Sequence, residues 1–250
     1  MRILSINVKA GGLRAQIDTL LQRALNHNAD VYVVTEFRDT STGARIRATL
    51  RQNGCDSQAY SRAHRGNGVL VAARWRFHAV YNPAGLPEES YPNALIECIF
   101  NDLHIVGAYL PGQDRKRPHF EYLIRFAQAM DAQEKAAMII GDLNSGRNET
   151  DIEANLGKNR LADEFSTAGQ YRLLEQHWKE AWLYKHPNEV EFSWYPRAGV
   201  PQRKNGWRLD KAFVSAALLP RVRDAFYDHE FRLQGLTDHS ALIVDLERTQ

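Results

Sequence analysis

Five short apolar runs in this chain each meet, at one edge, a polar side chain that can bind a metal ion or a phosphate. The residues at these edges are Asn7, Glu36, Asp142 with Asn144, Asp210, and Asp238 with His239. At the edge of one strand such a residue is more often a turn former than a catalytic group. Five edges of this kind constrain the fold more strongly, because strands that deliver acids to one rim build a site for a hard metal ion and a phosphate.

The apolar runs themselves predict a fold class. Short apolar segments bounded by polar residues or Gly are read as strands: Met1–Asn7, Val31–Thr35, Gly68–Ala73, Leu95–Phe100, Leu103–Leu110, Ala137–Gly141, Leu209–Ser215 and Ala241–Leu246. Helical spacing follows Ile17 and Pro118, and a less regular third helix is expected from Asp151 to Gly169. Several strands are apolar throughout, so both of their faces are expected to be covered. The periodicity alone indicates an α/β protein.

Composition sets broad limits on the class of protein. At 250 residues, with 44% hydrophobic and 25% charged residues, we expect one domain over residues 1–250. No apolar stretch approaches the roughly 20 residues of a membrane span, and the first residues lack the parts of a signal peptide. Cys55 and Cys98 form neither a metal-binding motif nor a disulfide framework. We therefore expect a cytoplasmic protein without a membrane partner.

Two of the strand edges carry a family resemblance. Through Gly141-Asp142-Leu143-Asn144 and Thr237-Asp238-His239-Ser240, the chain resembles the endonuclease/exonuclease/phosphatase superfamily over nearly its whole length. That superfamily includes exonuclease III, apurinic endonucleases, deoxyribonuclease I, neutral sphingomyelinases and inositol polyphosphate phosphatases. The resemblance implies a four-layer sandwich, in which two mixed β-sheets pack face to face with helices outside.

The resemblance also implies a role for each residue at the rim. Glu36 would bind Mg²⁺ or Mn²⁺, with Asn7 and Asp238 assisting, since Mg²⁺ prefers oxygen ligands. Asp142 would orient or deprotonate the attacking water, and Asn144 would donate hydrogen bonds to phosphoryl oxygens. His239, held by Asp210, would act as a cation against the developing charge. Each role requires that the fold brings these side chains to one rim.

Tyr109, in Tyr109-Leu110-Pro111, indicates the branch of the superfamily. The exonuclease III and apurinic endonuclease branch carries a Tyr-x-Pro close to the scissile phosphate, although a buried structural Tyr before a turn Pro is the alternative. The segment Asn205–Asp210 also resembles this branch, in which the residues matching Trp207 and Leu209 line the pocket for a flipped abasic sugar. The chain departs from the branch at Lys9, at Gly112 and in the short stretch Gly112–Phe120, which has no counterpart of a DNA-penetrating loop.

Basic and aromatic residues gather in two segments that are expected to contact DNA. They are Arg115, Lys116, Arg117, Trp194, Arg203, Lys204, Trp207, Arg208 and Leu209; Lys9 could contact phosphate or weaken metal binding, and Asn67 could extend the patch. Cations for phosphates together with aromatics for bases or sugars is the composition of a DNA groove. A solvated basic loop is the alternative, and the net charge of +2 decides nothing.

These observations favour a Mg²⁺-dependent DNA phosphodiesterase, an endonuclease or 3′–5′ exonuclease that includes abasic sites among its substrates. We expect it to be a monomer with DNA as its partner. A small-molecule or lipid phosphoesterase on the same scaffold is the alternative function. A binding protein with a decayed site is the third, and it is disfavoured because the expected site residues other than Lys9 are intact.

Overall fold

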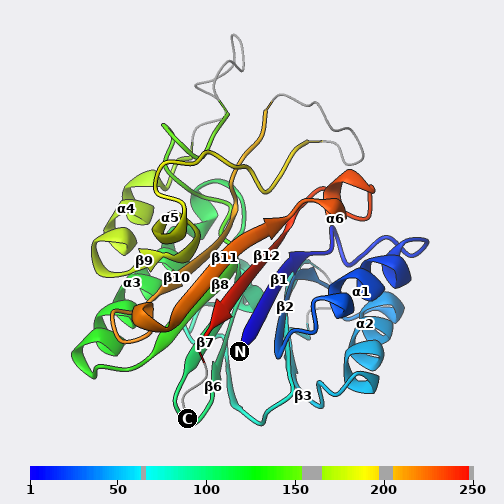
Figure 1. Cartoon of the computed structure of the whole chain (residues 1–250). Helices are drawn as coiled ribbons and strands as arrows, with labels where there is room; N and C mark the ends of the chain where they lie inside the picture. The colour runs from blue at the N-terminus through cyan, green and yellow to red at the C-terminus, as the bar shows by residue number, and fades with distance from the viewer. Residues whose placement is uncertain (63–65, 154–164, 197–204, 248–250) are drawn as a thin grey trace.

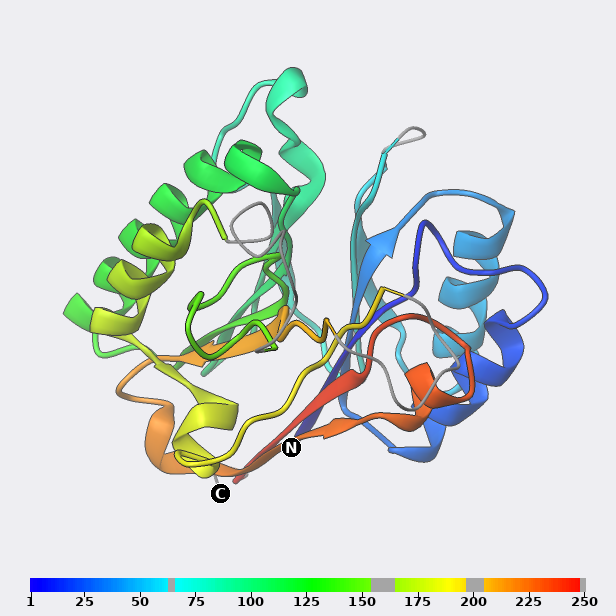
Figure 2. The same ribbon diagram turned by 90° about the horizontal axis from the view of Figure 1, so that it is seen from above.

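The chain folds into four layers. The computed structural model describes residues 1–62, 66–153, 165–196 and 205–247. Two six-stranded sheets pack face to face and helices cover their outer sides, as Figure 1 and the view from above in Figure 2 show. The expected α/β sandwich of two mixed sheets flanked by helices is confirmed.

The first sheet is centred on the N-terminal strand. Its order is β11-β12-β1-β2-β4-β3, with β1 parallel to β2 and antiparallel to β12. The strands are β1 (Arg2–Asn7), β2 (Val31–Phe37), β3 (Ser57–Tyr60), β4 (Gly68–Ala73), β11 (Val222–Asp228) and β12 (Ala241–Leu246). The pairing of β1 with β12 joins the two ends of the chain, and Met1 N donates to Leu246 O at 2.7 Å.

The second sheet has the order β5-β6-β7-β8-β10-β9. Its strands are β5 (His78–Tyr81), β6 (Leu95–Ile99), β7 (His104–Tyr109), β8 (Ala137–Asp142), β9 (Lys179–Glu180) and β10 (Asp210–Val214). The central strands β7 and β8 are parallel, whereas β10 runs antiparallel to β8 and pairs Asp210 with Asp142. Both sheets are therefore mixed, and each places its central strand ends at the same rim.

Strand alternation divides the core into layers. Along β1, Ile3 joins the cluster between the sheets, whereas Leu4 and Ile6 join the cluster beneath the helices. Successive side chains in a strand point to opposite faces, so both faces of these strands are apolar because both are buried. This parity continues to the strand ends and decides which polar residues face the space between the sheets.

Helices cover the outer face of each sheet. The longer ones are α1 (Ile17–Asn26), α2 (Ser41–Gln52), α3 (Arg117–Ala132) and α4 (Ala168–His177), with the short α5 (Ala181–Lys185) and α6 (Glu230–Leu233). In α1, residues at spacings of three and four are buried against the first sheet, and α3 packs on the second. None of the helices in the described ranges is long and apolar enough to cross a membrane.

The sequence placed most central strands correctly but missed peripheral elements. The eight expected strands match β1, β2, β4, β6, β7, β8, β10 and β12, with ends that shift by at most two residues. No expectation covered α2, β3, β5, β9 or β11. The helix expected from Asp151 to Gly169 is wrong at both described ends, because Asp151–Glu153 is not helical and α4 begins only at Ala168. Residues 154–164 lie outside the described part of the chain.

Candidate active site

Asn7 joins the two sheets at one rim of the sandwich. It ends β1 on the side that faces the second sheet, where Asp142 ends β8. Asn7 Nδ2 donates to Asp142 Oδ2 at 2.9 Å and to Glu36 Oε1 at 3.2 Å. Asn7 is fully buried, and its Oδ1 accepts from the Lys9 amide at 2.8 Å. One amide thus holds two carboxylates that come from different sheets.

Glu36 reaches the same rim through an irregularity in β2. Strict alternation would place Glu36 beside Tyr32 and Val34, under the helices. The register between β2 and β4 shifts between Thr35 and Phe37, and Glu36 has a φ of 53°. A bulge of this kind re-aims a side chain. Glu36 Oε2 then accepts from the Ala10 amide at 2.5 Å and from Asn67 Nδ2 at 2.9 Å.

Asp142 is a buried carboxylate with both oxygens engaged. Besides the contact from Asn7, its Oδ1 accepts from the Asn144 amide at 2.9 Å. Asn144 reaches this position because its backbone is left-handed, with a φ of 46°, and not because the segment is extended as expected. Burial raises the pKa of Asp142 to about 7; nearby His239 opposes this rise, whereas Asp210 and Glu36 add to it.

His239 and Asp210 form a buried pair on the other side of Asp142. His239 Nδ1 lies 2.8 Å from Asp210 Oδ2. Burial alone would lower the pKa of His239, but the Asp210 carboxylate outweighs it and raises the pKa to about 9. The Ser193 hydroxyl accepts from the Asp210 amide at 3.1 Å, and the Tyr227 hydroxyl donates to the Asp210 carbonyl at 2.6 Å. The imidazole is therefore cationic at neutral pH and fixed in orientation.

Tyr109 ends β7 and also faces the space between the sheets. Its hydroxyl lies 3.2 Å from Asn67 Nδ2. Burial raises the pKa of Tyr109 well above its usual range, and the carboxylates of Glu36 and Asp142 add to the rise. The phenol is therefore a neutral hydrogen-bond donor. Asn67 had been expected to extend a DNA-binding patch, but the structure places it at the rim, in contact with Glu36 and Tyr109.

Lys9 and Asp238 pair with each other at the edge of the site. Lys9 Nζ lies 3.1 Å from Asp238 Oδ2, and the Lys9 side chain is 41% exposed. Thr237, which precedes Asp238, ties this segment to β1 by donating to the Asn7 carbonyl at 2.8 Å. The lysine therefore neutralises an acid that the sequence had assigned to the metal ion.

The described basic residues that were expected to contact DNA differ in exposure. Arg115 and Arg117 are exposed, but Lys116 between them is buried and donates to the Asn144 carbonyl. Burial lowers the pKa of Lys116 to about 8. Arg203 and Lys204 lie outside the described residues.

Arg208 is buried, although its sequence context predicted a contact with DNA. Its side chain is 2% exposed and pairs with Asp151 and Glu180, with Nε 2.9 Å from Asp151 Oδ1 and Nη1 2.5 Å from Glu180 Oε2. It cannot serve as an exposed phosphate contact, because its charge is already used inside the protein. The sequence could not show this, because Asp151 and Glu180 lie far from Arg208 along the chain.

Partly buried aromatic residues border His239. The Trp194 ring lies 6.5 Å from the His239 ring and 5.9 Å from the Trp207 ring, measured between centroids. Trp207 packs edge-on against Phe165 at 5.0 Å. Leu209 belongs to the same cluster but is only 5% exposed, so it supports this wall from beneath instead of forming an open contact surface.

The donor set of the rim fits a hard divalent cation. Glu36, Asp142 and Asp210 come together in one buried region, and Asp210 Oδ1 is buried without a hydrogen-bond partner among the described residues. Within that part of the chain, no three His, Cys, Asp or Glu side chains form a ready-made metal cluster. Mg²⁺ commonly takes only one or two protein carboxylates and keeps several waters, so these residues suit it.

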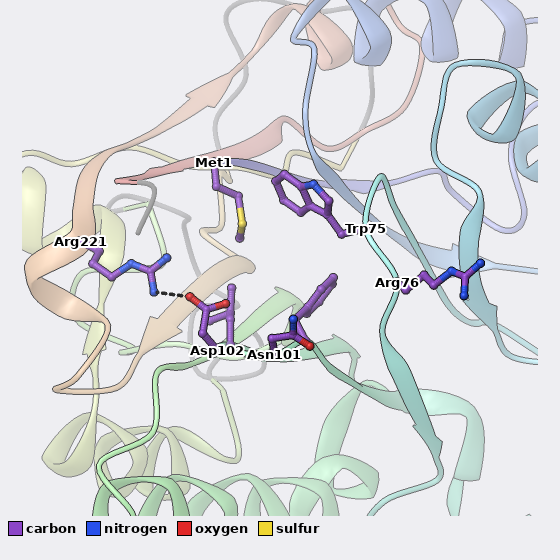
Figure 3. Close-up of a pocket in the computed structure, with 8 residues that line it drawn as sticks. Met1, Trp75, Arg76, Asn101, Asp102 and Arg221 are labelled. Carbon is purple, nitrogen blue, oxygen red and sulfur yellow. Dashed lines mark hydrogen bonds and ion pairs between the residues drawn. The ribbon is translucent and has the colours of Figure 1, made fainter. Parts of the chain in front are cut away.

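A separate pocket of about 400 Å³ lies at the opposite end of the sandwich. Figure 3 shows Met1 and Trp75 among the residues that line it, with Asp102 directed toward Arg221. The two charged groups lie 3.5 Å apart. The pocket is built at the start of β1 and the end of β4, whereas the carboxylates gather at the other ends of these strands. It therefore lies away from the carboxylates of the rim.

Several residues of the rim were missed or misassigned by sequence reasoning. Asn67 lies directly before β4, which is the same kind of strand-edge position that revealed Asn7 and Glu36. That criterion, applied to every strand, would have found it. Thr237 stood in a motif that carried the family resemblance, but nothing in the sequence indicated that its hydroxyl, or that of Ser193, would bond to backbone groups of the rim.

Comparisons with known proteins agree with this geometry. The family model described as "Endonuclease/Exonuclease/phosphatase family" matches residues 3–239. The exodeoxyribonuclease of Bacillus subtilis (strain 168) is 27% identical over 170 residues, which cover 64% of this chain and 67% of that protein. The DNA repair nuclease APEX1 of Danio rerio is 27% identical over 181 residues, which cover 68% of this chain and 56% of that protein.

Solved structures show the same fold. An AP endonuclease from Archaeoglobus fulgidus has a TM-score of 0.80 at 19% identity, covering 99% of this chain and 100% of that one. A 3′–5′ exonuclease from Neisseria meningitidis has a TM-score of 0.81 at 20% identity, with the same coverage. These relatives are consistent with the exonuclease III and apurinic endonuclease branch that Tyr109 indicated. The chain belongs to the endonuclease/exonuclease/phosphatase family.

Proposed function

We propose that the protein is a cytoplasmic, monomeric, Mg²⁺- or Mn²⁺-dependent DNA phosphodiesterase that hydrolyses its substrate by in-line attack of water. The observation that carries the proposal is the Asn7 amide, which holds Glu36 and Asp142 beside each other at the rim. This contact brings a metal-binding carboxylate next to a buried general base. The His239–Asp210 pair supplies a cation to the same region.

Glu36 is the main candidate for holding the metal ion, with Asn7 as a neutral neighbour. Asp238 contributes less in this proposal, because Lys9 already neutralises it. A bound divalent ion would offset the negative charge of the phosphoryl oxygens. Lys9, which is 41% exposed, can also reach toward a phosphate, so of the two roles that the sequence left open we assign it contact with the substrate.

Asp142 is proposed as the base that accepts a proton from the attacking water. Burial places its pKa at about 7, so near neutral pH it is a competent base while remaining largely ionised above that value. The Asn7 and Asn144 contacts fix the direction of both oxygens. The Asn144 side chain itself donates to the Leu110 carbonyl at 2.8 Å, so its role in the proposal is to orient Asp142.

His239 and Tyr109 are proposed to stabilise the charge that develops on the phosphoryl oxygens. Because Nδ1 of His239 is engaged by Asp210, its Nε2 is the nitrogen left to donate to the substrate. Tyr109 is a neutral phenol and donates its hydroxyl proton. Donors that are already oriented before the reaction stabilise a transition state without the cost of reorganisation.

DNA is the substrate class that the surroundings favour. The relatives named above are DNA nucleases, and the aromatic wall of Trp194 and Trp207 borders His239. The short stretch from Gly112 to Phe120 folds into a 3₁₀ turn (Gln113–Lys116) and the start of α3. It leaves no long loop to wedge into a duplex, so we expect cleavage at abasic sites or 3′ ends with modest selectivity.

An oligonucleotide panel tests this function directly. We expect Mg²⁺- or Mn²⁺-dependent cleavage within a set of abasic, nicked, duplex, single-stranded and RNA substrates, with no activity in chelator. Asp142→Asn should lower turnover by at least about a hundredfold because it removes the base, while DNA binding persists. Full activity in chelator would contradict the proposal. So would hydrolysis of sphingomyelin or an inositol phosphate by a protein that cleaves none of the nucleic acids.

A further inference from the structure

The Asn67 side chain connects two parts of the site that carry different tasks. It lies directly before β4 and donates from Nδ2 to Glu36 Oε2 at 2.9 Å and to the Tyr109 hydroxyl at 3.2 Å. Glu36 belongs to the first sheet and Tyr109 to the second. A single amide group therefore contacts both the proposed metal ligand and the proposed phosphate donor.

Arg38 fixes the direction of this amide. Arg38 Nε donates to Asn67 Oδ1 at 2.6 Å. Arginine has only donors, so the carbonyl oxygen of Asn67 must face it. The NH₂ group then has to face the opposite way, toward Glu36 and Tyr109. Its two hydrogens match the two acceptors, a carboxylate oxygen and a phenol oxygen.

The consequence for Tyr109 is a fixed hydrogen-bond polarity. A phenol can donate one proton and can also accept. Because the Asn67 NH₂ group can only donate, the Tyr109 oxygen accepts from it and the Tyr109 proton remains available for another partner. A carboxylate in the place of Asn67 would reverse this arrangement, since it would itself accept the Tyr109 proton.

We propose that Asn67 is a positioning residue that makes Tyr109 a donor toward the scissile phosphate and holds Glu36 for the metal ion. This inference rests on the proposed phosphodiesterase function. It assigns Asn67 two separable effects. One acts on turnover through Tyr109, and the other acts on metal affinity through Glu36.

The turnover effect is tested by a double-mutant cycle with Asn67→Ala and Tyr109→Phe, measured at saturating Mn²⁺ on the best DNA substrate. In the parent protein, Asn67→Ala should lower kcat by at least about tenfold with little change in KM, the scale of a disturbed transition-state donor. In the Tyr109→Phe background the same change should cost less than about twofold, because the group it orients is already missing. If Asn67→Ala lowered kcat by the same factor in the Tyr109→Phe background as in the parent protein, the inference would be overturned.

The isosteric variant Asn67→Asp separates loss of the hydrogen-bond donor from loss of folding. It keeps the size of the side chain and the contact to Arg38, but it replaces the donor by an acceptor beside Glu36. We expect kcat to fall at least as far as in Asn67→Ala. Asn101→Asp is the matched control, since Asn101 is exposed at the opposite end of the sandwich. Turnover in Asn67→Asp equal to that of the control would overturn the inference.

The metal effect has a readout that needs no substrate. Calorimetric titration of the protein with Mn²⁺ should give weaker binding for Asn67→Ala than for the parent, by about threefold or more, the scale of one lost hydrogen bond. Unchanged affinity would overturn this part. A parent protein that binds Mn²⁺ but cleaves no DNA would reject the proposed function, whereas an active parent with independent mutational effects would reject only the role of Asn67.

Discussion

Arg208 shows how its surroundings decide what a charged side chain can do. In sequence it stands between Trp207 and Leu209 and reads as a phosphate contact. In the structure it sits over the Trp182 ring at 4.6 Å and balances Asp151 and Glu180. Lys211 adds a second buried cation, with Nζ 3.0 Å from Asp151 Oδ2. Two basic and two acidic side chains thus form one buried cluster of ion pairs.

The Arg208→Met variant is expected to lower stability and not DNA affinity. Removing the guanidinium takes the shared cation away from two buried carboxylates, which should cost about 3–5 kcal/mol of unfolding free energy. Chemical denaturation measures this loss. The exposed Arg117→Met is the control and should change stability by less than about 0.5 kcal/mol. The dependence of DNA binding on salt should be the same in Arg208→Met as in the parent, and a flatter slope would restore Arg208 as a phosphate contact.

At the scale of elements, the sequence reveals strands that are buried on both faces and conceals those at the edges. Ala137–Gly141, and Val31–Thr35 up to its closing threonine, are apolar and were predicted. In β11, only Val222, Ala225 and Tyr227 are buried. The polar residues between them interrupt the apolar pattern, so the strand was not predicted. The helix α2 was missed because Gly43, Ile46 and Leu50 are its only buried residues. Short or half-exposed elements depend on their neighbours for stability, and a local pattern does not contain those neighbours.

The last residue of β11 connects this strand to α1. Asp228 pairs with Arg23 at 2.7 Å and with His27 at 2.8 Å. Burial alone would raise the pKa of Asp228, but hydrogen bonds from His27 and Arg23 outweigh it and hold the pKa at about 2. The carboxylate therefore stabilises the packing of α1 on the first sheet for as long as it is ionised.

Acid should remove this stabilisation over a defined range. The folded-state pKa is below the unfolded one of about 3.9, so the contribution is complete above that value and disappears as the pH falls toward about 2. Asp228→Asn should lower the unfolding free energy by up to about 2 kcal/mol at pH 7, and the difference from the parent should shrink between pH 4 and 2. Asp18→Asn on the exposed side of α1 is the control. A difference that is independent of pH would contradict this assignment.

At the scale of the whole molecule, the site depends on how the two sheets pack. Asn7 and Glu36 come from one sheet, and Asp142, Asp210 and Tyr109 come from the other. The recurrence of polar residues at strand ends predicted that these residues would gather at one rim. It could not predict the bulge that turns Glu36 inward or the left-handed backbone of Asn144. The family resemblance indicated which residues form the candidate site. The hydrogen bonds among these residues depend on how the two sheets pack, so the sequence could not show them.

Gly107 allows the sheets to approach each other. A Cβ at this position would lie 2.8 Å from Val71 Cγ2 and 3.1 Å from Val69 Cγ1. Gly107→Val should therefore cost about 1–3 kcal/mol of unfolding free energy through overpacking, and kcat should fall because the Asn7–Asp142 contact crosses the same interface. Gly112→Ala is the control, since no atom lies within 4 Å of its Cβ position. Equal stability and equal turnover in the two variants would show that the spacing of the sheets has no influence on the site.

The pairing of β1 with β12 has a consequence for the biogenesis of the enzyme. Asn7 and Glu36 are translated early, but Asp238, His239 and the strand that flanks β1 are translated late. A growing chain that has not yet reached His239 lacks both the imidazole and β12, which completes the first sheet beside β1. The side chains of the rim can therefore assemble only after His239 has been translated, about 200 residues after Asn7 and Glu36.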